Sequence, residues 1–183
     1  MPDTEKKIYL TFDDGPIPQI TEWVLGVLDR YKIKATFFCV GENVEKHPGI
    51  YSKLLEKGHR VGNHTFNHIK GLSTSNALYY KNVQQCRKYI DSNLFRPPYG
   101  QLKTTQETHL SKMYKIIMWD VLSYDYSASV SPEKCLNNVI KNTRNGSVIV
   151  FHDSIKAFKN LEFALPKAIE HLQRENFEFC LFD

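Results

Sequence analysis

Short apolar runs alternate with longer amphipathic segments along the chain. The runs are rich in β-branched and aromatic residues, which is typical of strands that are buried on both faces of a parallel sheet. They predict seven strands, at residues 8–12, 35–40, 59–61, 94–95, 115–119, 147–151 and 177–182. No internal repeat or linker interrupts the alternation, so we expect a single domain.

The segments between these runs carry apolar residues at helical spacing. For example, Ile20, Val24 and Val27 fall at i, i+4 and i+7 and therefore share one helix face. Helices are predicted at residues 20–31, 50–57, 76–92, 132–143 and 161–175. Pro166 counts against the first turn of the last helix and favours a start near residue 165. The alternation predicts parallel strands with right-handed crossovers, in either a doubly wound sheet or a closed, irregular barrel.

Composition narrows the class of protein. With 183 residues, 42% of them hydrophobic and 24% charged, the chain can bury a core and is not disordered. The net charge of +4 is spread over isolated Lys and Arg residues, so we expect a solvated surface and no nucleic-acid partner. No run is long enough to span a bilayer, and no signal segment is visible. We interpret residues 1–5 as an N-terminal extension or a trimmed start.

Polar clusters follow the ends of five predicted strands. They lie at residues 13–16, 64–68, 96–100, 120–126 and 152–153. The carboxyl ends of parallel strands meet at one face of the fold, and active sites form there. We therefore expect these clusters to build one active site.

Two of these clusters carry residues suited to a metal site. His64 and His68 are four residues apart, so on a helical turn both face the same way, although a surface pair is the alternative. Asp13 and Asp14 are adjacent carboxylates, and one of them is expected to hold a cation or a basic group. The alternative for this segment is an ordinary Asp-Gly-Pro turn. Two histidines and a carboxylate from another loop would make an open catalytic zinc site.

The other clusters offer acid, base and hydrogen-bonding groups. Arg96 can clamp a carboxylate with two hydrogen bonds, or form a structural ion pair. The backbone at Tyr99 and Gly100 can present an N–H group to an oxyanion, although packing is an equal role for Tyr99. His152 ends an apolar run beside Asp153, which suits either a general acid or a buried, hydrogen-bonded histidine.

Four motifs, in this order along the chain, resemble the polysaccharide deacetylases, which are also called carbohydrate esterase family 4 or the NodB-homology domain. They are TFDDGP at residues 11–16, HTFNH at 64–68, RPPY at 96–99 and VFHD at 150–153. The resemblance covers residues 6–183 and implies a distorted (β/α)7, TIM-like barrel. It also implies metal-dependent hydrolysis of N-acetyl or O-acetyl groups on a polysaccharide such as peptidoglycan, a chitin-like oligomer or xylan.

The resemblance implies roles for the matched residues. Asp14, His64 and His68 would bind the metal, Zn²⁺ or another divalent transition metal. Asp13 would be the general base, and Arg96 would pair with it.

Further roles follow from the remaining motifs. His152 would be the general acid, and the Tyr99 N–H group would stabilise the oxyanion. Substrate would contact Tyr99, Tyr126 and Val150, the last of these in the pocket for the acetyl methyl group. The aromatic residues expected to stack on sugar rings are Trp119, Tyr124 and Tyr126.

One motif departs from the family. The family pattern D-x-x-D-[WY] aligns with residues 122–126, where Leu122 replaces the first aspartate, which in the family supports the catalytic histidine. We therefore expect His152 to lack this partner unless Asp120 or Asp125 replaces it. The departure leaves two alternatives open, a metal-binding carbohydrate-recognition protein with weak or no catalysis and a small-molecule amidohydrolase. Because the family's substrates lie outside the cytoplasm, we expect envelope or extracellular action.

Overall fold

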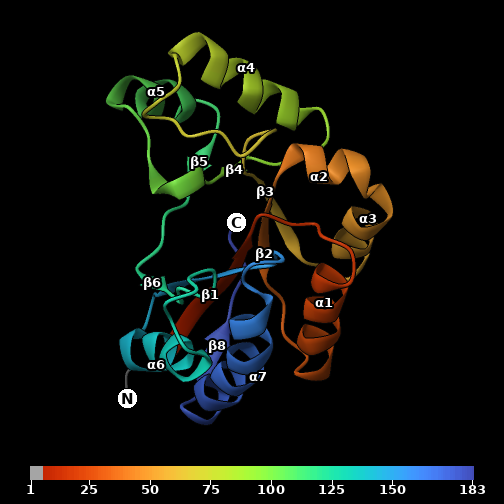
Figure 1. Cartoon of the computed structure of the whole chain (residues 1–183), viewed down its shortest axis with the longest axis vertical. Helices are drawn as coiled ribbons and strands as arrows, with labels where there is room; N and C mark the ends of the chain where they lie inside the picture. The colour runs from red at the N-terminus through yellow and green to blue at the C-terminus, as the bar shows by residue number, and fades with distance from the viewer. Residues whose placement is uncertain (1–5) are drawn as a thin grey trace.

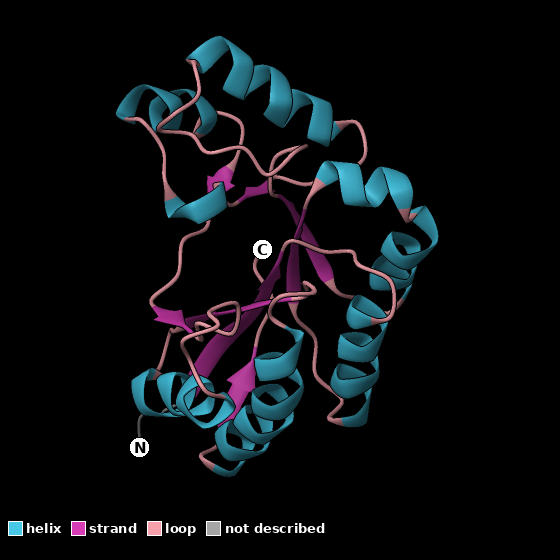
Figure 2. Ribbon diagram, viewed as in Figure 1, coloured by secondary structure: helices cyan, strands magenta, loops and turns pink. Residues whose placement is uncertain are grey.

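A curled parallel sheet forms the centre of the molecule, and helices cover its outer face (Figures 1 and 2). The computed structural model describes residues 6–183, so the predicted extension at residues 1–5 lies outside the described part. The strands are β1 (Lys6–Asp13), β2 (Thr36–Cys39), β3 (Arg60–Asn63), β4 (Leu94–Phe95), β5 (Lys115–Ile116), β6 (Val121–Leu122), β7 (Val148–His152) and β8 (Phe177–Phe179).

The strand order is β5-β4-β3-β2-β1-β7-β6, and β8 pairs with the first residues of β1. Within the described residues no pairing joins β5 to β6, so the barrel is open between them. The prediction of a distorted (β/α) barrel is confirmed, with this gap as its main irregularity.

The helices are α1 (Ile20–Arg30), α2 (Gly41–Lys46), α3 (Pro48–Glu56), α4 (Asn76–Arg87), α5 (Thr104–Leu110), α6 (Pro132–Asn142) and α7 (Phe158–Arg174). A single 3₁₀ turn covers Pro98–Gly100. The pattern did not predict α2 and α5, because helices of 6 and 7 residues are too short to display a helical period.

Two boundary predictions were wrong. Helix α7 begins at Phe158 and contains Pro166, although we expected a start near residue 165. Leu161 and Leu165 are fully buried on this helix, and each contributes roughly 1.5–3 kcal/mol, which outweighs the cost of about 3 kcal/mol for an internal proline. The predicted strand 115–119 ends at Ile116, and a separate strand β6 follows it.

Aromatic packing under the sheet fixes the strands that carry the site. The ring of Phe12 on β1 stacks on Phe37 of β2 at 5.0 Å and on Phe151 of β7 at 6.3 Å. The same three strands are in register, with Asp13 opposite His152. Burial of these rings therefore holds the strand ends beside one another at the carboxyl face.

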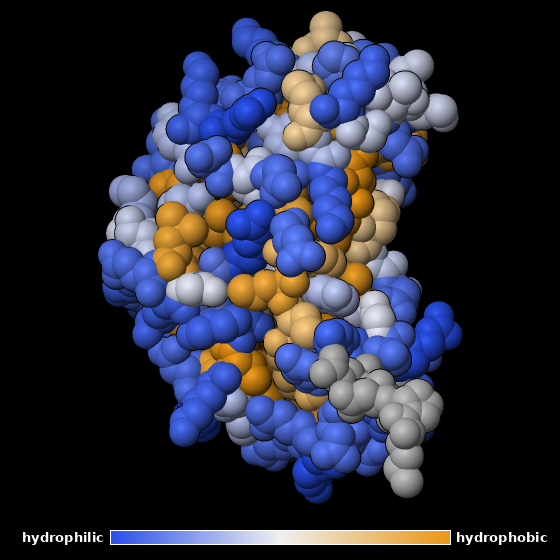
Figure 3. All heavy atoms as spheres, turned by 180° about the vertical axis from the view of Figure 1, so that it is seen from behind, coloured by the Kyte–Doolittle hydropathy of each residue, from blue (hydrophilic) through white to orange (hydrophobic). Residues whose placement is uncertain are grey.

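The surface is mostly polar, with apolar patches between polar residues on the back of the molecule (Figure 3). Cys39, Cys86 and Cys135 are free thiols buried in the fold. No described helix is both long and apolar enough for a membrane span.

Candidate active site

A cavity of about 310 Å³ opens at the carboxyl ends of the strands, and residues from all five predicted clusters line it. Three further lining residues lie outside those clusters, namely Gln101, Trp119 and Lys156. Of these, Gln101 and Lys156 were missed by sequence reasoning, because neither lies in a recognisable motif. The clusters meet because every strand pairing in the sheet is parallel.

Asp14, His64 and His68 converge on one side of this cavity. Each offers a ligand atom, and these atoms all lie within 4.8 Å of one another. Asp14 Oδ1 lies 3.2 Å from His68 Nε2 and 3.9 Å from His64 Nε2. Two imidazole nitrogens and a carboxylate oxygen are a donor set suited to zinc or another divalent transition metal, with positions left for water or substrate. The residues therefore fit a divalent metal.

The two histidines do not lie on a helix, so the predicted helical turn was wrong. Thr65 and His68 have φ angles of 63° and 55°, and these left-handed residues turn the chain back on itself. The side chain of Asn82 on α4 holds the turn, because its Oδ1 accepts hydrogen bonds from the N–H groups of Phe66, at 2.7 Å, and Asn67, at 3.2 Å. This turn brings the ring centroids of His64 and His68 to 5.1 Å from each other without any helical turn between them.

The surroundings of these ligands set their charge states. Burial lowers the pKa of His64 to about 4, so its ring is neutral at pH 7. His64 Nδ1–H donates to the carbonyl of Arg96 at 2.7 Å, which leaves the Nε2 lone pair for a metal. Burial acts to raise the pKa of Asp14, but its hydrogen bond with His68 and the nearby imidazoles outweigh this and hold that pKa well below its usual range. Asp14 is therefore a carboxylate.

Asp13 lies beside this triad and is fixed from below by Arg96. Asp13 Oδ1 accepts a hydrogen bond of 2.7 Å from Nη1 of Arg96, whose side chain is fully buried. The contact uses one carboxylate oxygen rather than both, because Nη1 also donates to Thr11 Oγ1 and Nε donates to the carbonyl of Ile117. The other oxygen, Oδ2, lies 4.0 Å from His64 Nε2. One oxygen of Asp13 is thus anchored, and the other faces the ligands.

His152 has a carboxylate partner, and it is Asp125, one of the two candidates that the sequence offered. Asp125 Oδ1 lies 2.7 Å from His152 Nδ1, and its Oδ2 accepts a 2.7 Å hydrogen bond from the backbone N–H of His152. Burial acts to lower the pKa of His152, but the charge and hydrogen bond of Asp125 outweigh it and raise that pKa to about 9. Asp120 does not take this role, because its carboxylate accepts from Val148 N–H at 2.7 Å, away from the cavity.

The three predicted substrate contacts lie in different places. Tyr99 lines the cavity in a left-handed conformation with φ 61°, and no described residue accepts a hydrogen bond from its backbone N–H. The ring of Tyr126 packs edge-on against His152 at 4.9 Å. Val150 is fully buried and does not line the cavity, which corrects its predicted position. The apolar wall is Leu122, the residue paired with Val150 on β6.

Asp153 supports the cavity from behind. Its Oδ1 accepts from Gly15 N–H at 3.0 Å, and its Oδ2 accepts from Thr21 Oγ1 at 2.6 Å. Burial raises the pKa of this carboxyl to about 7. A Cβ atom on Gly15 would lie 1.9 Å from Asp153 Oδ2, so only glycine fits here. This contact fixes the segment that carries Asp14, a role that the sequence pattern did not assign.

The comparison with known proteins agrees with this geometry. Residues 1–114 match the sequence profile described as polysaccharide deacetylase, which is more than half of the chain.

The chain belongs to the polysaccharide deacetylase family.

The similarity to individual family members extends beyond the matched region. The chain is 32% identical over 190 residues to a peptidoglycan-N-acetylglucosamine deacetylase of Bacillus cereus, covering 98% of this chain and 87% of that protein. It is 32% identical over 157 residues to a chitooligosaccharide deacetylase of Azorhizobium caulinodans, covering 81% of this chain and 74% of that protein. A crystal structure of a peptidoglycan N-acetylglucosamine deacetylase superposes with a TM-score of 0.91 at 30% identity, covering 98% of this chain and 87% of that one.

Other relatives are longer. The chain spans 58% of a second Bacillus cereus peptidoglycan deacetylase and 39% of one from Listeria monocytogenes. The protein is therefore a polysaccharide deacetylase, as the resemblance implied, and a carbohydrate-binding protein without catalysis is not favoured. The reason for that alternative, a missing partner for His152, is removed by Asp125.

Proposed function

We propose that this deacetylase hydrolyses N-acetyl groups of amino-sugar residues, in peptidoglycan strands or chitooligosaccharides. The named activities of the similar proteins from Bacillus cereus and Azorhizobium caulinodans support this choice of substrates. Both kinds of glycan lie outside the cytoplasm of the cell that degrades or remodels them, so envelope or extracellular action is part of the proposal.

A divalent metal, Zn²⁺ in the first instance, would be held by Asp14, His64 and His68. When bound, it would supply a Lewis acid that polarises the acetyl carbonyl and lowers the pKa of a water molecule. The neutral ring of His64 and the ionised carboxyl of Asp14 support this assignment, since both are in the protonation state that metal binding requires.

Asp13 acts as the general base of the proposed reaction. Its free Oδ2 accepts the proton of the attacking water, and the hydrogen bond from Arg96 to Oδ1 keeps the carboxylate oriented during this transfer. The water oxygen then bonds to the acetyl carbon, and the carbonyl oxygen becomes an oxyanion. The unpaired N–H of Tyr99 stabilises this charge, and one such donor is worth about 3–4 kcal/mol.

His152 acts as the general acid that completes the cleavage. The carbon–nitrogen bond breaks only when the nitrogen receives a proton, because an unprotonated amine anion is a poor leaving group. His152 carries this proton at neutral pH, since its pKa is raised to about 9 by Asp125. The products are acetate and a free amino sugar.

The observation that carries the proposal is that one cavity is lined by the three ligand residues, by Asp13 and by His152, with Arg96 paired to Asp13 and Asp125 paired to His152 behind them. The test is acetate release from acetylated chitooligosaccharides, peptidoglycan and acetylxylan, measured with and without a chelator. We expect release from the N-acetylated substrates, loss of activity with chelator and recovery on adding Zn²⁺. Binding of these glycans without acetate release, or release from acetylxylan only, would contradict the proposal.

A further inference from the structure

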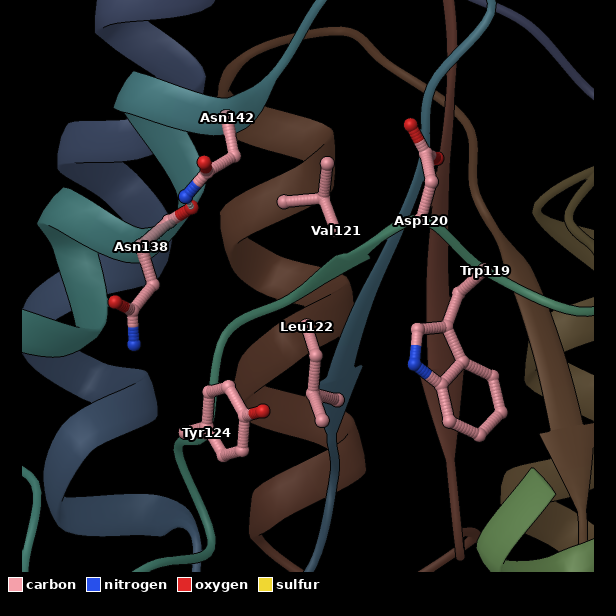
Figure 4. A pocket seen from close by; sticks show the side chains of 7 residues that line it. All are labelled: Trp119, Asp120, Val121, Leu122, Tyr124, Asn138 and Asn142. Atoms are coloured by element: carbon pink, nitrogen blue, oxygen red, sulfur yellow. Dashed lines mark hydrogen bonds between the residues drawn. The ribbon is translucent and has the colours of Figure 1, made fainter.

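One lysine lines the catalytic cavity, and the proposed reaction does not use it. Among the described residues of this lining, Lys156 is the only Lys or Arg, and no sequence motif pointed to it. The neighbouring hollow at the outer edge of β6 offers no such group, since its one charged lining residue is Asp120 (Figure 4). A permanent positive charge is therefore a property of the catalytic cavity itself.

The backbone around Lys156 is fixed by the fold. The residue lies in the turn between β7 and α7, and Asp153 and Ala157, on either side of it, are buried. The N–H group of Ala157 donates a 3.1 Å hydrogen bond to the carbonyl of Ser154, which closes this turn. The side chain of Lys156 itself is exposed at the cavity. The fold thus holds a solvated ammonium group in a defined place.

The ammonium group lies on the same side of the cavity as His152. Its Nζ is 5.5 Å from the ring centroid of Tyr126, within the range at which an aromatic face attracts a cation. The ring of Tyr126 packs against the ring of His152 at 4.9 Å. Tyr126 therefore contacts both groups, and a ligand held by Lys156 lies near the nitrogen that His152 protonates in the proposed reaction.

The carboxylates of the cavity do not neutralise this lysine. Asp13 is paired with Arg96 at 2.7 Å, and Asp14 lies 3.2 Å from His68. Within the part of the chain that the structure describes, no carboxylate lies within 4.0 Å of Lys156 Nζ, and no acceptor takes a hydrogen bond from it. The three N–H donors of the ammonium group are therefore available to a ligand.

The charge of the cavity favours an anion as that ligand. The charge of Asp13 is cancelled by Arg96, so Asp14 alone opposes the two positive charges of a divalent ion held beside it. Lys156 adds a further positive charge to this excess. A cavity with an excess of one sign of charge concentrates ligands of the opposite sign. Carboxylates are the anions that a lysine most commonly pairs with in proteins.

We propose that Lys156 determines substrate specificity by binding a carboxylate carried by the glycan, so that the enzyme prefers an acidic amino-sugar polymer to a neutral one. This inference rests on the proposed function and narrows it. Alternate sugars of peptidoglycan carry a lactyl ether that ends in a carboxylate or in a peptide with carboxylates, whereas chitooligosaccharides are uncharged. Because the ion pair is solvated, we expect a preference of about three- to tenfold in kcat/KM.

The test compares substrates that differ only in charge. Peptidoglycan oligosaccharides freed of peptide are used with their lactyl carboxylates either free or converted into methylamides, and acetate release is measured. A second pair carries the peptide, with its carboxylates free or converted in the same way, so that the two sources of the carboxylate are distinguished. Each preference is measured again at higher salt, where screening of a solvated ion pair reduces it.

The variants separate the charge of Lys156 from its packing. Lys156→Met keeps an apolar stem against Tyr126 but lacks the ammonium group, Lys156→Gln is a second uncharged variant, and Lys156→Arg keeps the charge. Lys167→Met is the matched control. Lys167 is exposed on α7 and its Nζ lies 3.9 Å from the ring centroid of Phe163, but it does not line the cavity.

We expect the unmodified protein, Lys156→Arg and Lys167→Met to prefer the free carboxylate, in one or both substrate pairs. In Lys156→Met and Lys156→Gln the ratio of the two kcat/KM values falls to about one. Equal kcat/KM for both members of both pairs in the unmodified protein, or a preference that survives in Lys156→Gln, would overturn the inference. If Lys156→Met does not fold, Lys156→Gln decides. Absence of acetate from every substrate would refute the proposed function instead, so the two failures are distinguishable.

Discussion

Replacement of Asp125 by asparagine tests how the fold tunes His152. Asp125 is fully buried, and its carboxylate contacts both the ring and the backbone N–H of His152 at 2.7 Å. Asparagine has nearly the same shape and keeps an oxygen acceptor, but it lacks the negative charge. The change therefore removes the electrostatic partner of the imidazolium and leaves the effect of burial, which lowers the pKa of His152.

The size of the effect follows from the pKa values. The pKa of His152 is raised from 6.5 to about 9, although burial acts in the opposite direction. Each pKa unit corresponds to about 1.4 kcal/mol, so the stabilisation of the protonated ring amounts to about 3 kcal/mol. In Asp125→Asn we expect the pKa of His152 to fall by more than one unit. A general acid works only when protonated, so activity is lost as the pH rises through this pKa.

The assay is the pH dependence of kcat/KM for acetate release between about pH 5 and pH 10, with both proteins loaded with zinc. We expect the alkaline limb of the profile to move to lower pH in Asp125→Asn. Asp120→Asn is the matched control. Asp120 lies just before strand β6 and Asp125 lies just after it, but the Asp120 carboxylate accepts its hydrogen bonds from Val148 N–H and Ser147 Oγ. A lower plateau with an unmoved alkaline limb in Asp125→Asn would refute the assignment of His152 as an acid tuned by Asp125.

Four further outcomes are expected. Asp13→Asn keeps zinc bound, as measured by elemental analysis, but loses acetate release; an active variant would remove Asp13 from the role of base. Arg96→Met leaves the Asp13 charge buried without its partner, so denaturant unfolding detects a loss of about 3–5 kcal/mol, and a loss below about 1 kcal/mol would argue against a buried ion pair. Gly15→Ala places Cβ against Asp153 and lowers both thermal stability and zinc affinity, whereas a variant with unchanged zinc affinity would show that the contact does not position the ligands. Because the pKa of His152 is raised on folding, its pair with Asp125 stabilises the protein fully below about pH 6.5 and progressively less up to about pH 9, so the Tm difference between wild type and Asp125→Asn narrows over that interval; a constant difference would contradict this linkage.

The sequence was informative about the site because the chemistry sits at strand ends. Buried strands produce apolar runs that are visible in the chain, and the polar residues that follow them, such as Asp14 and His152, therefore stand out. In a parallel sheet those positions meet at one edge whatever the exact loop geometry. This is why the approximate strand boundaries were sufficient to predict which residues come together.

The details of the loops were not predictable from periodicity. His64 and His68 are brought together by left-handed residues and by Asn82, which lies 14 residues beyond His68 in the sequence and belongs to another element. The partner of His152 depends on a tertiary contact, so spacing within the motif could not distinguish Asp125 from Asp120. Val150 lies two residues before His152 and therefore on the same face of β7, but it is fully buried, and Leu122, its partner on β6, lines the cavity instead.

The open barrel edge was also beyond the sequence pattern. Residues 116–119 form an apolar run, only Asp120 separates it from Val121 and Leu122, and the pattern therefore did not predict a separate strand β6. The break is a property of the whole sheet, because β5 and β6 stand at its two ends and the curled sheet does not bring them together. A hollow of about 280 Å³ lined by Trp119, Leu122 and Tyr124 lies at this edge and could be recognised only in three dimensions.

The central claim is that Asp14, His64 and His68 hold one divalent metal ion beside Asp13. It is tested most directly by calorimetric titration of metal-free protein with Zn²⁺, comparing the unmodified chain with His68→Ala and with His171→Ala as a histidine outside the cavity. We predict one ion per chain in the unmodified protein and in His171→Ala, and a loss of affinity in His68→Ala that exceeds the roughly 10–100-fold lost when an outer-shell partner is removed. Equal zinc affinity in all three proteins, or no binding in any of them, would contradict the account.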